Sequence, residues 1–283
     1  MENKRLYTVA SVKDSIRRGG LKPIKSLGQN FLVDGNIVRK ICDTANITKE
    51  DTVLEIGPGI GTLTEELALR AKRVIAVEID RHLIPVLEEN LAPYENVRLI
   101  HADILETDAD ALIQKNGGGG PAKVVANLPY YITTPILTGL LEHTRLIQSI
   151  TAMMQKEVAE RIVAKAGEAA YGSLSVFVQS FADVQIAFSV PNTVFIPKPN
   201  VGSAVVHMER KEKDERFDPA FFAFVRKAFS LRRKTMANAL SANDGYEKRA
   251  VIQALQAAGL PENIRAEALH AEKLFSVFKV LRD

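Results

Sequence analysis

Residues 52–61, TVLEIGPGIG, constrain this chain most, because an apolar segment there runs directly into three alternating glycines. The apolar segment predicts a short buried strand, and Gly57, Gly59 and Gly61 predict a tight turn behind it. Glycine lets the backbone approach a ligand closely and adopts positive φ readily. A strand, a turn of this kind and a following helix form the first unit of a nucleotide-binding α/β sheet. NAD, FAD and S-adenosylmethionine all fit such a turn, and a tight turn without a ligand is the alternative.

A helix is predicted to begin directly after the turn. Thr62 is placed to cap this helix and Glu65 to return the hydrogen bond, which is the pattern of a capping box. Leu63 and Leu67 add an apolar stripe at helical spacing.

The composition bounds the class of protein. A chain of 283 residues can hold one large domain and a smaller one, and 46% hydrophobic residues can bury a core. No apolar run approaches the ~18 residues of a membrane-spanning helix, and the N-terminus has no apolar secretion signal. The single Cys42 excludes an internal disulfide and suits a reducing compartment, so we expect a cytoplasmic protein without membrane association. The histidines show no ligand spacing, and we expect no metal site.

The charge is divided unevenly along the chain. Residues 1–33 carry an excess of five positive charges, and residues 34–126 an excess of six negative charges. The remaining residues carry an excess of four positive charges. Basic segments around an acidic region are typical of a protein that binds a polyanion beside a separate cofactor site. Solvated surface lysines are the alternative for the N-terminal segment.

Acidic side chains end two further predicted strands. Residues 74–80, VIAVEID, predict a buried parallel strand, and Glu78 is the acid expected about twenty residues after the glycine turn, where it would bind ribose hydroxyls. Asp80 is predicted to cap the next helix, and Asp34 to cap an earlier helix that carries Ile37, Val38 and Ile41. Asp103 follows a third strand over 97–100 and is either a turn residue or an acceptor for an adenine amino group.

The fourth predicted strand, 123–126, is followed by Asn127-Leu128-Pro129-Tyr130. The lone pair of an adenine amine is delocalised into the ring, so the amine is a poor nucleophile. The Asn127 side-chain oxygen and the Leu128 carbonyl could accept both amine hydrogens and direct the lone pair at an electrophilic methyl group. Pro129 restricts Leu128 to an extended conformation, and Tyr130 offers a ring for base stacking. Positioning and electrostatics would supply most of the catalysis, without a general base.

The remaining elements before residue 211 are predicted from their periodicity. Helices are expected over 134–141, 156–165 and 173–181, and strands over 147–154, 183–190 and 203–209. The last strands predict an antiparallel edge on a mostly parallel sheet. Phe195 lies in a proline-rich loop, where it is either a core residue or a clamp on a bound base.

Residues 211 onward predict only helices. Asp218 caps and Pro219 opens the first of them, and its buried side holds Phe221, Phe222, Val225 and Phe229. Five basic residues without an intervening acid follow from this helix: Arg226, Lys227, Arg232, Arg233 and Lys234. We interpret them as phosphate contacts, with a solvated surface as the alternative.

Six motifs together carry a resemblance to a known family. They are GQNFL (28–32), EIGPGIG (55–61), VEID (77–80), HADIL (101–105), NLPY (127–130) and FIPKPNVGSAVV (195–206). In this order they resemble the ribosomal RNA adenine N6,N6-dimethyltransferases over nearly the whole chain, with the bacterial branch that acts on small-subunit rRNA as the better match.

The resemblance implies S-adenosylmethionine as the cofactor. The residues that would line its site are Asn30, Leu32, Gly57, Glu78, Asp103 and Asn127. Glu78 would hold the ribose and Asp103 the cofactor adenine. Asn127, Leu128 and Tyr130 would hold the target base, with Phe195 covering its other face.

We therefore predict two domains. Residues 1–210 would form a Rossmann-like class I methyltransferase sheet, mostly parallel with an antiparallel edge, behind a basic N-terminal arm. Residues 211–283 would form a small all-α domain that contacts RNA.

The predicted reaction is dimethylation of N6 on two adjacent adenosines near the 3′ end of small-subunit (16S) rRNA. We expect a monomer that acts on this rRNA within a pre-30S particle during ribosome biogenesis. The alternatives are a large-subunit rRNA methyltransferase of the macrolide-resistance type, a non-catalytic RNA-binding assembly factor and an NAD-dependent oxidoreductase.

Overall fold

The computed structural model describes residues 5–21, 29–212, 214–231, 233–242 and 245–282. The chain divides into two compact units. The first comprises Met1–Ala159 and Val184–Arg210, and the second comprises Glu160–Asp183 and Lys211–Asp283. The break after Arg210 lies at the predicted boundary, whereas residues 160–183, expected in the first domain, group with the C-terminal helices.

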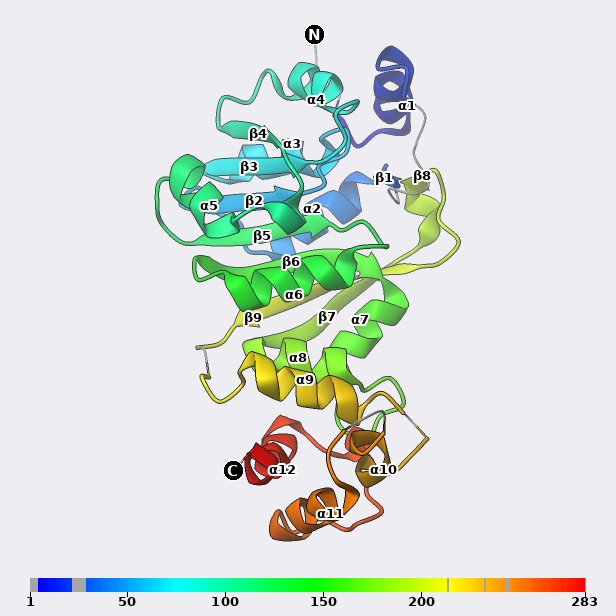
Figure 1. Cartoon of the computed structure of the whole chain (residues 1–283). Helices are drawn as coiled ribbons and strands as arrows, with labels where there is room; N and C mark the ends of the chain where they lie inside the picture. The colour runs from blue at the N-terminus through cyan, green and yellow to red at the C-terminus, as the bar shows by residue number, and fades with distance from the viewer. Residues whose placement is uncertain (1–4, 22–28, 213, 232, 243–244, 283) are drawn as a thin grey trace. The chain divides into compact units, whose positions relative to one another are not determined.

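A seven-stranded sheet forms the centre of the first unit (Figure 1). Its order is β4-β3-β2-β5-β6-β9-β7. The strands are β2 (Thr52–Ile56), β3 (Arg73–Glu78), β4 (Val97–His101), β5 (Ala122–Asn127), β6 (Ile147–Gln155), β7 (Ala182–Val190) and β9 (Ser203–Arg210). The strands from β4 to β6 pair in parallel, and β9 pairs antiparallel with β6. The predicted mostly parallel sheet with an antiparallel edge is confirmed.

Helices precede and connect these strands. They are α1 (Val9–Arg18), α2 (Gly35–Thr44), α3 (Thr62–Arg70), α4 (Ile84–Leu91), α5 (Ala109–Gly117), α6 (Thr133–His143) and α7 (Lys156–Val163). In Figure 1, α5 and α6 lie in front of the sheet, and α2 and α3 lie behind it. Two short strands, β1 (Phe31–Leu32) and β8 (Phe195–Ile196), pair antiparallel outside the sheet. Single turns of 3-10 helix lie at Ile104–Glu106 (η2) and Asn192–Val194 (η3).

The strand order reverses between β2 and β5. The chain proceeds from β2 through β3 to β4, and β5 then returns to the other side of β2. In such parallel sheets, ligands bind beyond the carboxyl ends of the strands on either side of the reversal. These ends are continued by the glycine turn after β2 and by Leu128 after β5.

Two of the predicted helix starts differ from the structure, and one agrees with it. Asp34 caps α2 as expected, since Oδ1 accepts from the backbone N–H groups of Asn36 and Ile37. The capping box at α3 is wrong, because Gly61 occupies the N-cap position with φ +92° and Thr62 is already the first helical residue. Glu65 instead accepts hydrogen bonds from the backbone N–H of Leu6 and the hydroxyl of Tyr94.

Asp80 does not cap α4 either. The helix begins at Ile84, and its N-cap residue Leu83 makes no side-chain hydrogen bond there. Asp80 lies in the preceding turn, where its carboxylate accepts from the backbone N–H of His82 and the side-chain amide of Gln29.

The second unit is helical and has an aromatic core. Its helices are α8 (Ser173–Phe181), α9 (Pro219–Ala228), α10 (Met236–Leu240), α11 (Lys248–Ala257) and α12 (Ala271–Arg282), with a 3-10 turn at Ala266–Ala268. Phe221 is fully buried at its centre, and Phe177 of α8 lies 4.7 Å from Phe222 of α9, measured between ring centroids. Asp218 caps α9 through a bond from the Phe221 N–H, as predicted. These aromatic contacts explain why α8 belongs with the C-terminal helices. Among the described residues, none of the helices is long and apolar enough to cross a membrane.

Candidate active site

A cavity lies at the reversal point of the sheet and comprises about 960 Å³ of space, including its open mouth. The predicted site residues on its wall are Asn30, Leu32, Gly57, Glu78, Asp103, Asn127, Leu128 and Tyr130. Residues distant in sequence, from the glycine turn, β3, η2 and the segment after β5, therefore meet at one site.

The glycine turn needs its glycines. The φ angles of Gly57, Gly59 and Gly61 are +69°, +64° and +92°, so the predicted positive-φ backbone is confirmed. A Cβ on Gly59 would lie 3.2 Å from the ring of Phe31. The turn thus presents bare backbone to the cavity, and a side chain at Gly59 would press on its opposite wall.

Glu78 holds this turn from the cavity side. Its carboxylate is 5% exposed and accepts from Gly59 N–H at 3.2 Å and from Asp80 N–H at 2.9 Å. Burial raises the pKa of Glu78, while the two backbone hydrogen bonds oppose the shift. Each carboxylate oxygen has a second lone pair, so Glu78 can accept further hydrogen bonds from a ligand.

Glu55 is a cavity residue that the sequence reasoning missed. It is 1% exposed, and Oε2 has no hydrogen-bond partner among the described residues. Burial raises the pKa of Glu55 to about 8, with an opposing effect of the Thr64 hydroxyl and a smaller contribution from the charge of Glu78. The acid immediately before the glycine turn was the available signal.

Asp103 is a turn residue, as one interpretation of its sequence position predicted, and it also lies at the cavity, where its role as an acceptor for adenine stays a prediction. Its Oδ1 accepts from the Leu105 N–H at 2.9 Å and begins the turn η2, and the residue also lines the cavity. Tyr131, also missed by the sequence reasoning, lies on the same wall and is 50% exposed.

The segment after β5 is held in a defined orientation. Nδ2 of Asn127 donates to the carbonyl of Asn30 at 3.2 Å, so the amide oxygen is the acceptor that Asn127 can offer a ligand. The N–H of Leu128 donates to the carbonyl of Met153 at 3.0 Å, which anchors the segment to β6.

Tyr130 is fixed through its hydroxyl. The hydroxyl lies 2.6 Å from Oγ of Ser203, which is 1% exposed at the start of β9. Burial raises the pKa of Tyr130, so the phenol is neutral at physiological pH. Ser203 is not among the described residues that line the cavity, but it holds Tyr130, which is.

Phe195 lies in the core. It is 3% exposed, pairs with Leu32 across β1 and β8, and packs with Met153 and Val205. The described residues on the cavity wall do not include it. The structure therefore favours the core interpretation of Phe195 over the base clamp.

The basic cluster occupies the end of α9 and the turn before α10. Arg226, Arg233 and Lys234 are exposed, and Lys227 is half-buried. The predicted contact residue Arg232 lies outside the described residues.

The cavity offers orientation rather than a reactive side chain. Among the described residues that line it there is no Ser, Cys, His or Lys. It combines exposed turn backbone, two buried carboxylates and a fixed amide oxygen, which suits the binding of a nucleoside cofactor beside a second polar ligand.

The fold and this site define a Rossmann-like class I methyltransferase, and comparisons with solved structures agree. The 23S rRNA methyltransferase ErmE has a TM-score of 0.68 at 28% identity, with 90% of this chain and 100% of that chain covered. A dimethyladenosine transferase from Plasmodium falciparum has a TM-score of 0.72 at 27% identity, with 87% and 95% covered.

The family follows from the sequence comparisons. The model of the family described as ribosomal RNA adenine dimethylase matches residues 21–283, and the chain belongs to this family. It is similar to the ribosomal RNA small subunit methyltransferase A of Ligilactobacillus salivarius, at 50% identity over 88% of this chain and 87% of the relative. The protein of the same description from Geobacillus thermodenitrificans is 45% identical over 99% of this chain and 98% of its own length. The chain is therefore an rRNA adenine dimethyltransferase. This result excludes the alternative of an NAD-dependent oxidoreductase.

Proposed function

We propose that this enzyme transfers methyl groups from S-adenosylmethionine to N6 of two adjacent adenosines near the 3′ end of small-subunit rRNA. The observation that carries the proposal is the orientation of Asn127. Its Nδ2 is engaged by the Asn30 carbonyl, and this directs an acceptor rather than a donor to a ligand in the cavity. An adenine amine is a donor of the matching kind.

The cavity residues fit S-adenosylmethionine, which supplies an electrophilic methyl group when it is bound. Glu78 would accept from the ribose hydroxyls and Asp103 from the adenine amine. Gly57 and Gly59 leave room for the cofactor against the turn.

The target adenine would lie against the segment after β5. Asn127 and the carbonyl of Leu128 would accept the two amine hydrogens, so that the nitrogen lone pair points at the methyl group. Tyr130 would stack on the ring, and Ser203 would keep it in place. No side chain needs to act as a base in the transfer, because orientation and electrostatics lower the barrier.

The rRNA contacts are proposed for the basic residues Arg226, Lys227, Arg232, Arg233 and Lys234. The relatives that are 44–50% identical are described as small-subunit enzymes, whereas the 23S enzyme ErmE is 28% identical. These identities favour the small subunit over the large one as the source of the substrate. We further propose that a monomer acts on a pre-30S particle in the cytoplasm.

The experiment that tests this function is transfer of labelled methyl groups to under-methylated small subunits, large subunits and naked rRNA, followed by mapping of the labelled nucleotides. We expect label on two adjacent adenosines of the small-subunit rRNA. Label on large-subunit rRNA would support the macrolide-resistance alternative, and binding without any transfer would support an assembly factor.

A further inference from the structure

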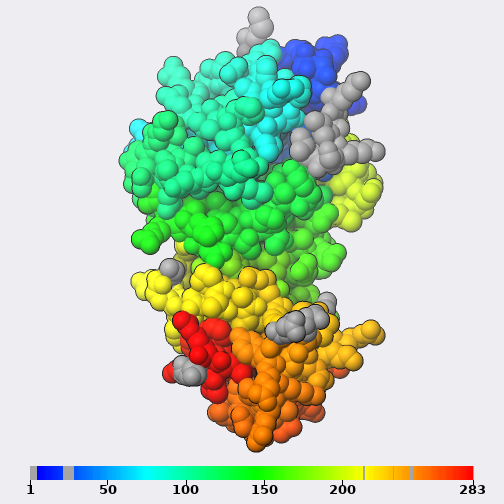
Figure 2. Space-filling view, viewed as in Figure 1, coloured from blue at the N-terminus to red at the C-terminus, as the bar shows by residue number. Residues whose placement is uncertain are grey.

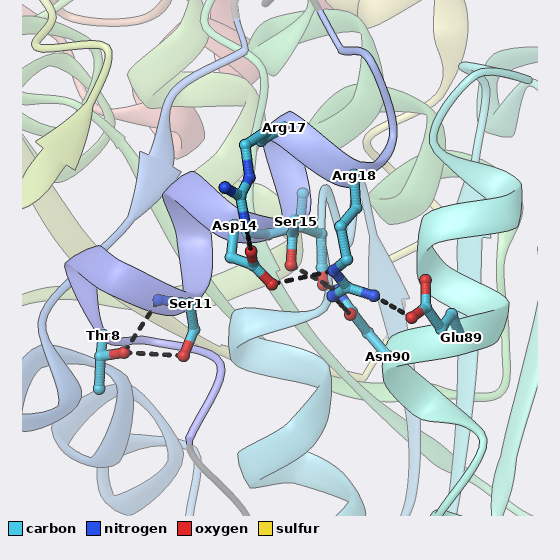
Figure 3. A network of polar contacts seen from close by, with 9 residues as sticks. Thr8, Ser11, Asp14, Ser15, Arg17, Arg18, Glu89 and Asn90 are labelled. Carbon is cyan, nitrogen blue, oxygen red and sulfur yellow. Dashed lines mark hydrogen bonds and ion pairs between the residues drawn. The ribbon is translucent and has the colours of Figure 1, made fainter.

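The carbonyl of Ile60, inside the glycine turn, is held from outside the cavity by Asn90. Nδ2 of Asn90, near the end of α4, donates to Ile60 O at 2.9 Å and to Ser15 Oγ at 3.2 Å. Its Oδ1 accepts from Nη2 of Arg18 at 3.1 Å. The carboxamide of Asn90 therefore connects the turn to two residues of α1. Figure 3 shows Asn90 beside Ser15 and Arg18.

The orientation of this carboxamide follows from its partners. A guanidinium only donates and a carbonyl only accepts, so the oxygen of Asn90 must face Arg18 and its nitrogen must face Ile60. An aspartate at this position would place an acceptor against the Ile60 carbonyl.

The helix α1 is itself firmly placed. Thr8 caps it by accepting from the Ser11 N–H, and Arg18 pairs with Asp14 and with Glu89 of α4. Val12 is fully buried and belongs to the same apolar cluster as Ile60 and Leu87. Figure 2 shows the blue N-terminal helix against the cyan part of the first unit. Within the segment predicted as a basic arm, residues 9–18 therefore form a docked helix, and Arg18 is neutralised by acids rather than presented to a polyanion.

A second bond joins the N-terminal segment to the helix behind the turn. The N–H of Leu6 donates to Oε2 of Glu65 at 2.9 Å, and Glu65 is 3% exposed in the first turn of α3. The family match begins at residue 21, so both contacts are made by residues that precede it.

The turn is thus held on two sides. Glu78 binds the Gly59 N–H from the cavity side, and Asn90 binds the Ile60 carbonyl from the α1 side. Three glycines with positive φ leave the turn many other conformations, and each one lowers the fraction of molecules ready to bind.

We propose that Asn90 is a positioning residue for the cofactor, which fixes the glycine turn in its binding conformation, and that Ser15 and Arg18 of α1 fix Asn90. This inference rests on the proposed binding of S-adenosylmethionine beside the turn.

The test compares Asn90→Asp with Asn96→Asp. Asn96 is also half-buried, and its Nδ2 donates to the Ala68 and Ala71 carbonyls at the other end of α3. The two variants lose the same kind of bond, but only one of these bonds reaches the turn. By calorimetry, Asn90→Asp should raise the Kd for S-adenosylhomocysteine by about tenfold, and Asn96→Asp should leave it within about twofold. With saturating S-adenosylmethionine, the single-turnover rate of Asn90→Asp should return to within about twofold of wild type.

Hydrogen exchange on the ligand-free proteins gives a readout that does not depend on the cofactor. The amides of residues 59–63 should exchange faster in Asn90→Asp than in Asn96→Asp. Equal exchange and equal Kd in the two variants would overturn the role of Asn90, even if both are equally destabilised to urea. Failure of wild type to bind S-adenosylhomocysteine would contradict the proposed function instead, and the exchange comparison would still judge Asn90.

The contribution of α1 is tested with Ser15→Ala/Arg18→Ala, with Glu89→Ala as the control. Glu89 contacts Arg18 but not Asn90 in the described structure. The double variant should raise the Kd by about threefold and the control should not. An unchanged Kd in the double variant would remove α1 from the proposal.

Discussion

The two strand ends that form the cavity present different chemistry. The end of β2, together with the adjacent end of β3 (the β2 end), offers backbone in a glycine turn and the buried acids Glu55 and Glu78. The end of β5 offers an amide oxygen, a backbone carbonyl and the ring of Tyr130. The carboxylate of Glu78 suits ribose hydroxyls, whereas neutral acceptors suit an amine that must keep its lone pair for reaction. Under the proposed function, the β2 end would hold the cofactor and the β5 end would orient the methyl acceptor.

The largest effect is expected at the β5 end. Asn127→Ala removes the acceptor proposed to orient the target amine. This change should destabilise mainly the transition state of methyl transfer. Single-turnover methylation at saturating cofactor should slow by about two to three orders of magnitude. RNA binding should persist, because phosphate contacts supply most of it. Methylation at the wild-type rate would show that the β5 end does not orient the amine.

Glu78→Ala should act on the β2 end. It removes the carboxylate proposed to accept from the ribose and releases the Gly59 N–H. The affinity for S-adenosylhomocysteine should fall by ~1.5–3 kcal/mol in calorimetry. Glu78→Gln retains one acceptor oxygen and should lose less. An unchanged affinity in a folded Glu78→Ala protein would refute the ribose assignment.

Ser203→Ala tests whether the β5 end needs a fixed aromatic ring. The Tyr130 hydroxyl would lose its partner in a buried site, and the KM for rRNA should rise by about fivefold, equivalent to ~1 kcal/mol. Tyr130→Phe removes the hydroxyl and keeps the ring, so adding Ser203→Ala to it should cost little more. Additive effects of the two substitutions would show that loss of this hydrogen bond does not cause the rise in KM.

The buried acid of the β2 end predicts a dependence of stability on pH. The pKa of Glu55 rises from 4.5 to about 8 on folding, so the folded protein retains a proton that the unfolded chain releases in this range. The free energy of unfolding of wild type should therefore fall as the pH rises through that window. Glu55→Gln has no titrating group at this position and should not lose stability in this way. In urea unfolding, the free energy of unfolding of Glu55→Gln minus that of wild type should therefore increase from pH 5 to pH 8. Parallel curves for the two proteins would contradict the raised pKa.

Substitutions in the second unit should leave both strand ends unaffected. Replacing Arg233 and Lys234 with Ala should reduce the log–log salt slope of rRNA binding by about 2, if both neutralise phosphates. The cofactor affinity and the saturated single-turnover rate should not change. An unaltered salt slope would identify these residues as a solvated surface.

The sequence predicted the local features well where one residue type has one dominant use. The glycines need positive φ, Asp34 and Asp218 cap helices, and the apolar runs form the parallel strands. The cavity residues from Asn30 to Tyr130 could be named because family motifs mark the strand ends.

The predictions that differ from the structure concern residues whose positions depend on tertiary contacts. Glu65 would have completed a capping box, but Leu6 and Tyr94 occupy its two oxygens. The segment that contains α1 was predicted as an arm, because the sequence does not show that Val12 is buried against residues of α4 and of the glycine turn. The packing of α8 with Phe222 and the core position of Phe195 likewise follow from contacts that periodicity does not contain.

The most direct test of the division between the two strand ends is a crystal structure of the enzyme with S-adenosylhomocysteine and adenosine. We expect the ribose of the cofactor product at Glu78, and the amine of the separate adenosine at the oxygens of Asn127 and Leu128. S-adenosylhomocysteine seated against Asn127 and Tyr130 through its adenine, with adenosine at Glu78, would contradict it.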